Sequence, residues 1–213
     1  MKVSIQKRTY AGAFALAFGV LLFFVAEYVT SLGWVNPDYS YISNWISDLG
    51  VPIVTDAINS PFYMLINFMF VTYGILSAAS YWLIKPFLPK GIITTLAAAL
   101  LTIQGIGWII VGTFPGYDFP LQFMHGIGAC AIIYCGNVGG LLWGIKLLSE
   151  KDKKTGILGI VLGIGGLISS FAMFALSDSS FGGLLERITV YAPLVWSFAL
   201  GIRILFGREL QEG

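Results

Sequence analysis

The residues best suited to acid–base chemistry are one histidine and a few acids that lie in or beside apolar segments. The only histidine is His125, and the acids are Glu27, Asp48 and Glu186. Imidazole titrates near neutral pH, so it can exchange a proton with a ligand or with a neighbouring carboxyl group. We therefore predict His125, Asp48 and Glu186 as candidate catalytic residues, acting as general base and acid.

Further polar side chains are expected near the same membrane surface and are candidate ligand-binding residues: Glu27, Asn44, Ser47, Asn67, Gln104 and Arg187. Ionisable groups are costly inside a membrane, so they usually face the interior of a helix bundle. One hypothesis is therefore a polar pocket, open to the outer leaflet, that binds or modifies a ligand.

A structural interpretation of the same residues stays open beside this one. Glu27 would then pair with Arg187 or with His125. Asn67 and Gln104 would hydrogen-bond across helices and fix the bundle, as single polar residues often do in membranes.

Several chemistries lack the residues they need. With one histidine in the chain, a three-histidine zinc site or a bis-histidine haem cannot be built from this chain alone. The sequence contains no GxxxxGK[ST], HExxH or GxSxG motif, so nucleotide hydrolysis, zinc proteolysis and elbow-serine acyl transfer lack support. We expect no metal and no cofactor, and whether the chain is an enzyme stays open.

Long apolar blocks must position these side chains. The chain is 57% hydrophobic and 11% charged, and a block of about 20 apolar residues is what a helix needs to cross the hydrocarbon core. We predict an all-α integral membrane bundle in one domain, 1–213, and we expect the first block to be a retained span rather than a signal peptide. The six transmembrane helices are expected at 10–33, 58–84, 92–114, 120–147, 156–177 and 184–206.

The charges predict how the bundle lies in the membrane, because lysine and arginine are retained preferentially in cytoplasmic loops. Eleven of the twelve basic residues fall on one side: Lys2, Lys7, Arg8, Lys85, Lys90, Lys146, Lys151, Lys153, Lys154, Arg203 and Arg208. The other side holds Asp38, Asp48, Asp56, Asp118, Asp178 and Glu186, with Arg187 as its single base. This division predicts a multi-pass plasma-membrane protein with cytoplasmic N- and C-termini.

Glycines recur at helical spacing in two of the predicted spans, at Gly136, Gly140 and Gly144 and at Gly159 and Gly163. Small residues four apart let helix backbones approach closely in lipid. We interpret them as packing faces within the bundle, with dimer contacts as the alternative.

The outer segment between the first two spans is predicted to form a short amphipathic helix at the interface, over 39–49. Its apolar residues follow the i, i+3, i+4, i+7 spacing of one helical face: Ile42, Trp45, Ile46 and Leu49. Polar residues gather on the opposite side, as expected of a helix that lies on the membrane surface.

The run from Tyr39 to Gly50, followed by Asn67 in the next span, resembles the prokaryotic membrane family known as domain of unknown function 998. Further matches are Gly112 to Pro115, His125-Gly126, and Leu185 to Ile188. The resemblance implies a bundle of about six helices with its motif residues near the outer face, and it implies no activity. The polar matching positions are Asn44, Ser47, Asp48, Asn67, His125, Glu186 and Arg187.

Three classes of function remain open at this point. The chain is expected either to bind or modify a lipid-like ligand, to serve as a non-catalytic structural or accessory subunit of a larger membrane complex, or to be a small transporter or channel. The partners expected are membrane lipids and other membrane protein subunits. No nucleic acid is expected as a partner: the charges are segregated by membrane side, and the net charge of +1 carries no message about one.

Overall fold

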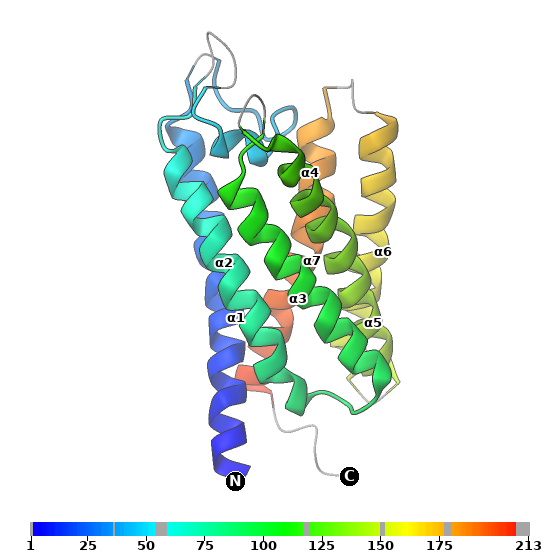
Figure 1. The fold of residues 1–213 in the computed structure, drawn as a ribbon. Helices are drawn as coiled ribbons and strands as arrows, with labels where there is room; N and C mark the ends of the chain where they lie inside the picture. Colours follow the sequence, from blue (N-terminus) through cyan, green and yellow to red (C-terminus); the bar gives the residue numbers. More distant parts are fainter. Residues whose placement is uncertain are drawn as a thin grey trace.

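The fold is a bundle of six long helices that run side by side (Figure 1). The structure is a computed structural model, and it describes residues 2–35, 37–53, 59–116, 120–149, 152–176 and 180–207. Five residues of the predicted charge pattern, Asp56, Asp118, Asp178, Lys151 and Arg208, lie outside the described residues. The prediction of an all-α fold with six helices long and apolar enough to cross a membrane is confirmed.

Five of the six spans are single α-helices: α1 (Lys2–Leu32), α2 (Tyr63–Ile84), α3 (Ile92–Thr113), α6 (Lys153–Ala175) and α7 (Gly182–Phe206). The fourth span is continuous but irregular. It consists of α4 (Gln122–Cys130), a π-helical stretch η3 (Ala131–Cys135) and α5 (Gly136–Leu148). Short 3₁₀-helices lie in two connections, η1 (Ser47–Gly50) and η2 (Lys85–Phe87). A π-helical turn inside an α-helix is rare and often lies at a functional site.

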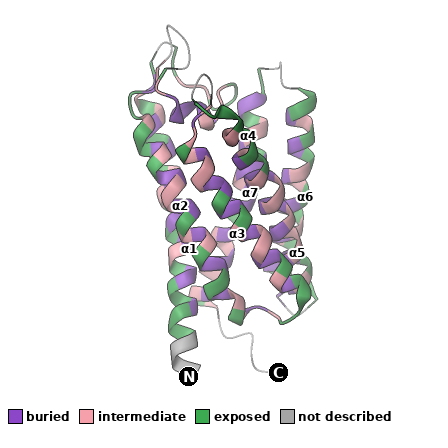
Figure 2. Cartoon of the chain, in the orientation of Figure 1, coloured by how far each residue is buried: buried purple, intermediate pink, exposed green. Residues whose placement is uncertain are grey.

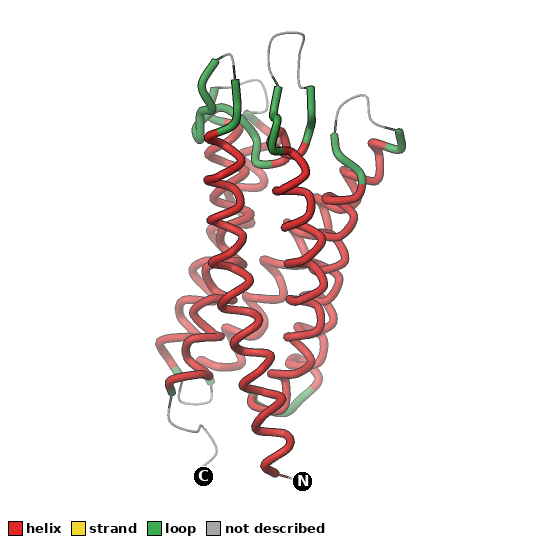
Figure 3. The backbone as a smooth tube through the Cα atoms, turned by 90° about the vertical axis from the view of Figure 1, so that its left-hand side faces the viewer, coloured by secondary structure: helices red, strands yellow, loops and turns green. Residues whose placement is uncertain are grey.

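Helices that follow one another in the chain are neighbours in space, and the ring closes where α1 packs against α7. The connections therefore alternate between the two ends of the bundle (Figures 1 and 3). We call the end that carries η1 the outer end, and the end that carries η2 the basic end. Lys85 and Lys90 lie at the basic end, and Arg203 there pairs with Asp152 at 2.9 Å between Nε and Oδ2.

Aromatic side chains fill the middle of the bundle, and buried residues lie on the inward faces of the helices (Figure 2). The rings of Trp108 and Phe23 meet edge to face, with centroids 5.0 Å apart, in the cluster nearer the outer end. A second cluster places Trp143 5.8 Å from both Tyr81 and Trp196. These rings are at most 2% exposed, and rings of this size close the space between helices.

The glycines of α5 and α6 form a close helix contact, as predicted for packing within the bundle. A Cβ atom on Gly144 would lie 2.8 Å from the backbone nitrogen of Ile160, and one on Gly156 would lie 2.8 Å from the carbonyl oxygen of Gly144. Because such distances leave no room for a side chain, small residues let these two backbones approach.

The outer segment differs from the predicted helix over 39–49. It forms a turn at 41–43 and then the four-residue η1, and Ile42 is exposed although Ile46 and Leu49 are buried. The apolar spacing therefore identified two of the buried residues but the wrong element.

The partners of the backbone hydrogen bonds in this segment explain why it does not form the predicted helix. The Ser40 amide donates to the side chain of Asn44, and the Trp45 amide donates to Asp48 Oδ2 at 3.2 Å. Asn and Asp side chains that bond to nearby backbone compete with helix formation. The carbonyl of Ile42 instead accepts from the Leu184 amide of α7 at 2.8 Å. The segment is thus folded by local turn bonds and attached to α7, and it does not continue as a regular helix.

Candidate functional site

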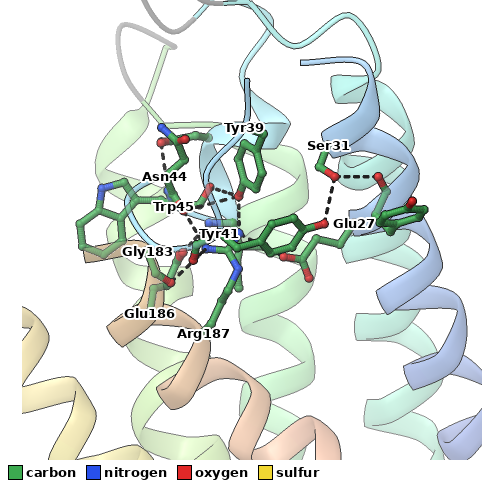
Figure 4. A network of polar contacts seen from close by, with 12 residues as sticks. Glu27, Ser31, Tyr39, Tyr41, Asn44, Trp45, Gly183, Glu186 and Arg187 are labelled. Atoms are coloured by element: carbon green, nitrogen blue, oxygen red, sulfur yellow. Dashed lines mark hydrogen bonds and ion pairs between the residues drawn. The ribbon is translucent and has the colours of Figure 1, made fainter. Parts of the chain in front are cut away.

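The guanidinium of Arg187 organises the outer end from within α7, where the residue is 4% exposed. Its Nη1 donates to the backbone carbonyls of Tyr41, Asn44 and Gly183 at 3.0, 2.7 and 3.0 Å. Two of these carbonyls belong to the outer segment, so one side chain fixes that segment to the bundle (Figure 4). Arginine suits this role because its donors form a rigid fork.

Glu27 of α1 balances the charge of Arg187. The carboxylate is 1% exposed and lies 3.2 Å from Arg187 Nη2. Tyr191, also on α7, donates to the same carboxylate, with its hydroxyl 2.8 and 2.7 Å from the two oxygens. A buried ion pair is tolerated when further hydrogen bonds satisfy its remaining atoms. Glu27 and Arg187 therefore serve as a structural pair.

Tyr39 of the outer segment completes this network. Arg187 Nη2 donates to its hydroxyl, which in turn donates to the Trp45 carbonyl at 2.8 Å. The guanidinium also lies over the rings of Tyr39 and Tyr41, at 5.3 and 4.7 Å from their centroids. Burial raises the pKa of Tyr39 above its usual value, an effect that the positive charge of Arg187 opposes. The phenol thus stays protonated and can donate its hydrogen bond.

Two more contacts hold the outer segment from α7 and α2. The Ile46 amide donates to Glu186 Oε2, and Asn67 Nδ2 donates to the Gly50 carbonyl at 2.8 Å. A Cβ atom on Gly50 would collide with the amide of Asn67, so the close approach requires glycine here.

A small cavity of about 30 Å³ lies just beneath the outer segment. Three polar residues from three different segments line it: Ser47 of η1, His125 of α4 and Glu186 of α7. The remaining walls are apolar and include Phe70 and Trp108. A cavity of this size accepts about two water molecules or one small polar group.

His125 is held in one tautomer by the backbone. Its Nδ1 lies 2.9 Å from the Phe114 carbonyl oxygen, which can only accept a hydrogen bond. Nδ1 must therefore carry the proton, and Nε2 is the basic nitrogen of the neutral ring. A histidine whose one nitrogen is fixed in this way is suited to receive a proton or a hydrogen bond at the other.

Trp108, which also lines the cavity, carries a donor without a partner in the described part of the chain. The indole is 2% exposed, and its Nε1 has no hydrogen-bond partner among the described residues. Buried donors without partners are rare in native proteins and call for an explanation. The residues that line the cavity thus offer a hydroxyl in Ser47, an acceptor in His125 and a carboxyl group in Glu186.

The sequence model of one protein family, described as a protein of unknown function (DUF998), matches residues 11–203. This chain belongs to the DUF998 family. No curated protein and no solved structure matches it. The match extends from the first turns of α1 to the last turn of α7, so all six spans belong to the DUF998 unit.

The candidate residues of this DUF998 chain separate into two groups. His125, Glu186 and Ser47 line one cavity. The others bond to protein atoms outside it: Glu27 and Arg187 to each other, and Asn44, Asp48 and Asn67 to backbone atoms of the outer segment. Gln104 lies apart from both groups, where its Oε1 accepts from the Tyr81 hydroxyl at 3.4 Å.

Sequence reasoning missed three residues of the DUF998 site: Tyr39, Tyr191 and Trp108. Tyr191 had a usable signal, because it follows Arg187 by four positions and so shares its helical face. Trp108 had none, since a tryptophan in an apolar span is ordinary core. Tyr39 had no usable signal either, because its bond to Arg187 joins residues 148 apart in sequence.

Proposed function

We propose that this multi-pass membrane protein binds the polar head of a lipid-like molecule at its outer end, in the cavity lined by Ser47, His125 and Glu186. The observation that carries the proposal is the convergence of three polar side chains on one small space with apolar walls. Ligand sites commonly combine apolar walls with a few placed polar groups.

The size of the cavity supports an amphiphile rather than a wholly polar ligand. About 30 Å³ accepts one small group such as a hydroxyl, amine or carboxyl. The rest of the ligand must then lie outside, and apolar side chains of the neighbouring α4, including Phe123 and Ile127, are exposed at the bundle surface. A lipid tail is compatible with such a surface.

His125 is the residue we propose for proton exchange with the bound head group. Its Nε2 is the free basic nitrogen, and the bond from Nδ1–H to Phe114 keeps the ring in place. Glu186 serves a second purpose, because its carboxyl group also accepts from the Ile46 amide of the outer segment. A ligand that contacts Glu186 would thus also affect the hydrogen bond that holds the outer segment over the cavity.

We place the outer end on the non-cytoplasmic side of the plasma membrane, with both termini in the cytoplasm. Support comes from the sequence, in which eleven of the twelve basic residues fall on the other side. The cavity would then take its ligand from the outer leaflet.

The test is lipid retention by the full chain, extracted from membranes in a mild detergent. We expect His125→Ala to reduce the copurified lipid, measured by mass spectrometry of the extract, at least fivefold per mole of folded protein. Thr113→Val is the matched control, because Thr113 lies near the outer end, is exposed, and bonds only within α3. Equal retention by the wild type, His125→Ala and Thr113→Val would overturn the proposal.

A non-catalytic role within a larger membrane complex is the second candidate. It is favoured by the internal use of Glu27, Arg187 and Asn67, which leaves them committed to holding the outer segment. In that case His125→Ala would leave lipid retention unchanged and would instead reduce a copurifying membrane protein. A transporter has less support, since buried aromatic rings in edge-on and tilted contacts occupy the described core of the bundle.

A further inference from the structure

A second cleft lies at the basic end of the bundle, far from the outer cavity. Its volume is about 930 Å³, which is within the range of small-molecule sites. It is bounded by the start of α1, the end of α2 with η2, the connection to α3, the first turn of α3, and the last turns of α7. Three separate stretches of the chain, within 6–10 and 82–95 and at Ile204, therefore contribute to one hollow.

Two lysines give this cleft its charge. Lys85 and Lys90 line it, and its lining includes no aspartate or glutamate among the residues that the structure describes. Neither lysine forms an ion pair among the described residues, while Lys85 Nζ lies 4.9 Å from the centre of the Trp82 ring. Two positive charges in one concave site, with no counter-charge on the described residues around them, favour an anion.

The first turn of α3 adds hydrogen-bond donors to the same place. Gly91 precedes the helix, and no side chain caps its start, so the amides of the first turn lack helical partners. Gly91 has φ of +143°, which residues with side chains rarely adopt, and nothing lies within 4 Å of a Cβ placed there. The backbone at Gly91 thus lines the cleft without a side chain over it. The positive, N-terminal end of the α3 dipole favours negative charge there.

The apolar part of the lining points to the rest of the ligand. Tyr10, Trp82, Phe87, Leu88 and Ile204 lie beside the lysines. Trp82 is 44% exposed and Tyr10 is 36% exposed, which suits rings at the level of lipid headgroups. The cleft therefore combines a positive region with aromatic and aliphatic walls at one end of the spans.

We infer that this cleft binds the headgroup of an anionic phospholipid from the leaflet at the basic end. The phosphate lies between Lys85, Lys90 and the first amides of α3, and the glycerol and upper acyl chains rest on the apolar wall. Basic pockets between transmembrane helices are a recurring form of lipid site. This inference does not depend on the proposed function of the outer cavity.

The experiment measures binding of phosphatidylglycerol and of phosphatidylcholine to the intact chain by native mass spectrometry in detergent. We expect phosphatidylglycerol to bind more tightly, and Lys85→Gln with Lys90→Gln to weaken its binding on the order of thirtyfold, at roughly five- to sixfold per lysine. The matched control is Lys153→Gln with Lys154→Gln, which removes equal charge at the same end on α6, outside the cleft.

Three outcomes would contradict the inference. The first is equal binding of the two lipids by the wild type. The second is equal loss in the two double variants, which would mean that only the overall charge of this end matters. The third is displacement of phosphatidylglycerol by millimolar inorganic phosphate, which would make the cleft a site for free anions. Intrinsic fluorescence of each variant checks that the bundle is folded.

Discussion

Replacing Arg187 with methionine is expected to lower the free energy of unfolding by about 3–5 kcal/mol, because it leaves the carboxylate of Glu27 buried without its counter-charge. The same change removes the donors to the carbonyls of Tyr41 and Asn44, so the outer segment loses its main attachment to α7. Thermal unfolding of the purified protein in detergent, followed by tryptophan fluorescence, measures the effect.

Two further variants separate charge from geometry. Arg187→Lys is expected to recover little, because one ammonium group cannot reach the carboxylate and the carbonyls that the guanidinium fork serves. Adding Glu27→Leu to Arg187→Met is expected to recover part of the loss by removing the unpaired charge. If Arg187→Met alone unfolds at the same temperature as the wild type, the ion pair does not hold this end together.

Gly183→Ala is the second change with a large expected effect. A Cβ atom at this position would lie 2.8 and 2.9 Å from the backbone carbon and nitrogen of Asn44, which cannot rotate away. We expect a loss of about 3 kcal/mol, at the upper end of the cost of overpacking, together with release of the outer segment from α7. Hydrogen exchange of the amides of 39–50 measures that release, and exchange is expected to become faster there.

Gly165→Ala on α6 is the control for this substitution. Nothing lies within 4 Å of a Cβ atom at Gly165, so only helix propensity changes. Alanine should stabilise the helix there by up to about 1 kcal/mol. Exchange in 39–50 that is equally slow in Gly183→Ala and Gly165→Ala would show that the outer segment does not depend on the contact between Gly183 and Asn44.

The spans were predictable from sequence because lipid requires long apolar helices, and this requirement is local. The pairing of Glu27 with Arg187 was also foreseen, as one of two structural pairings. That prediction follows from an equally simple rule, because charges at membrane depth need partners. Local patterns thus predicted the spans, and the need to neutralise buried charge predicted the ion pair between them.

The helix expected over 39–49 shows a limit of prediction from local sequence patterns. Its backbone atoms bond to Glu186, Arg187 and Leu184, which are about 140 residues away in sequence, and no spacing within the segment reveals such partners. The separation of Gln104 from the other candidates has a similar cause. The depth of each residue in the membrane could be estimated from its position along a helix, whereas the direction in which its side chain points within the ring of helices could not.

The π-helical stretch η3, which follows α4, could not be predicted from the spacing of apolar residues either. The extra residue in its turn changes which side chains of the fourth span face inward, and Ile132 and Ile133 there line the cavity beside His125. Membership of the DUF998 family names the unit but not its chemistry. The assignment of His125, Glu186 and Ser47 to one site therefore depends on the arrangement in space.

The most direct test of the central claim uses the fact that the chain has one histidine. In protein labelled with nitrogen-15 at histidine, the ring signals belong to His125 alone. We predict the neutral tautomer with hydrogen on Nδ1, and a shift of the Nε2 signal when lipid extract from the host membrane is added to delipidated protein. A hydrogen on Nε2, or ring signals that do not change with lipid, would contradict the account.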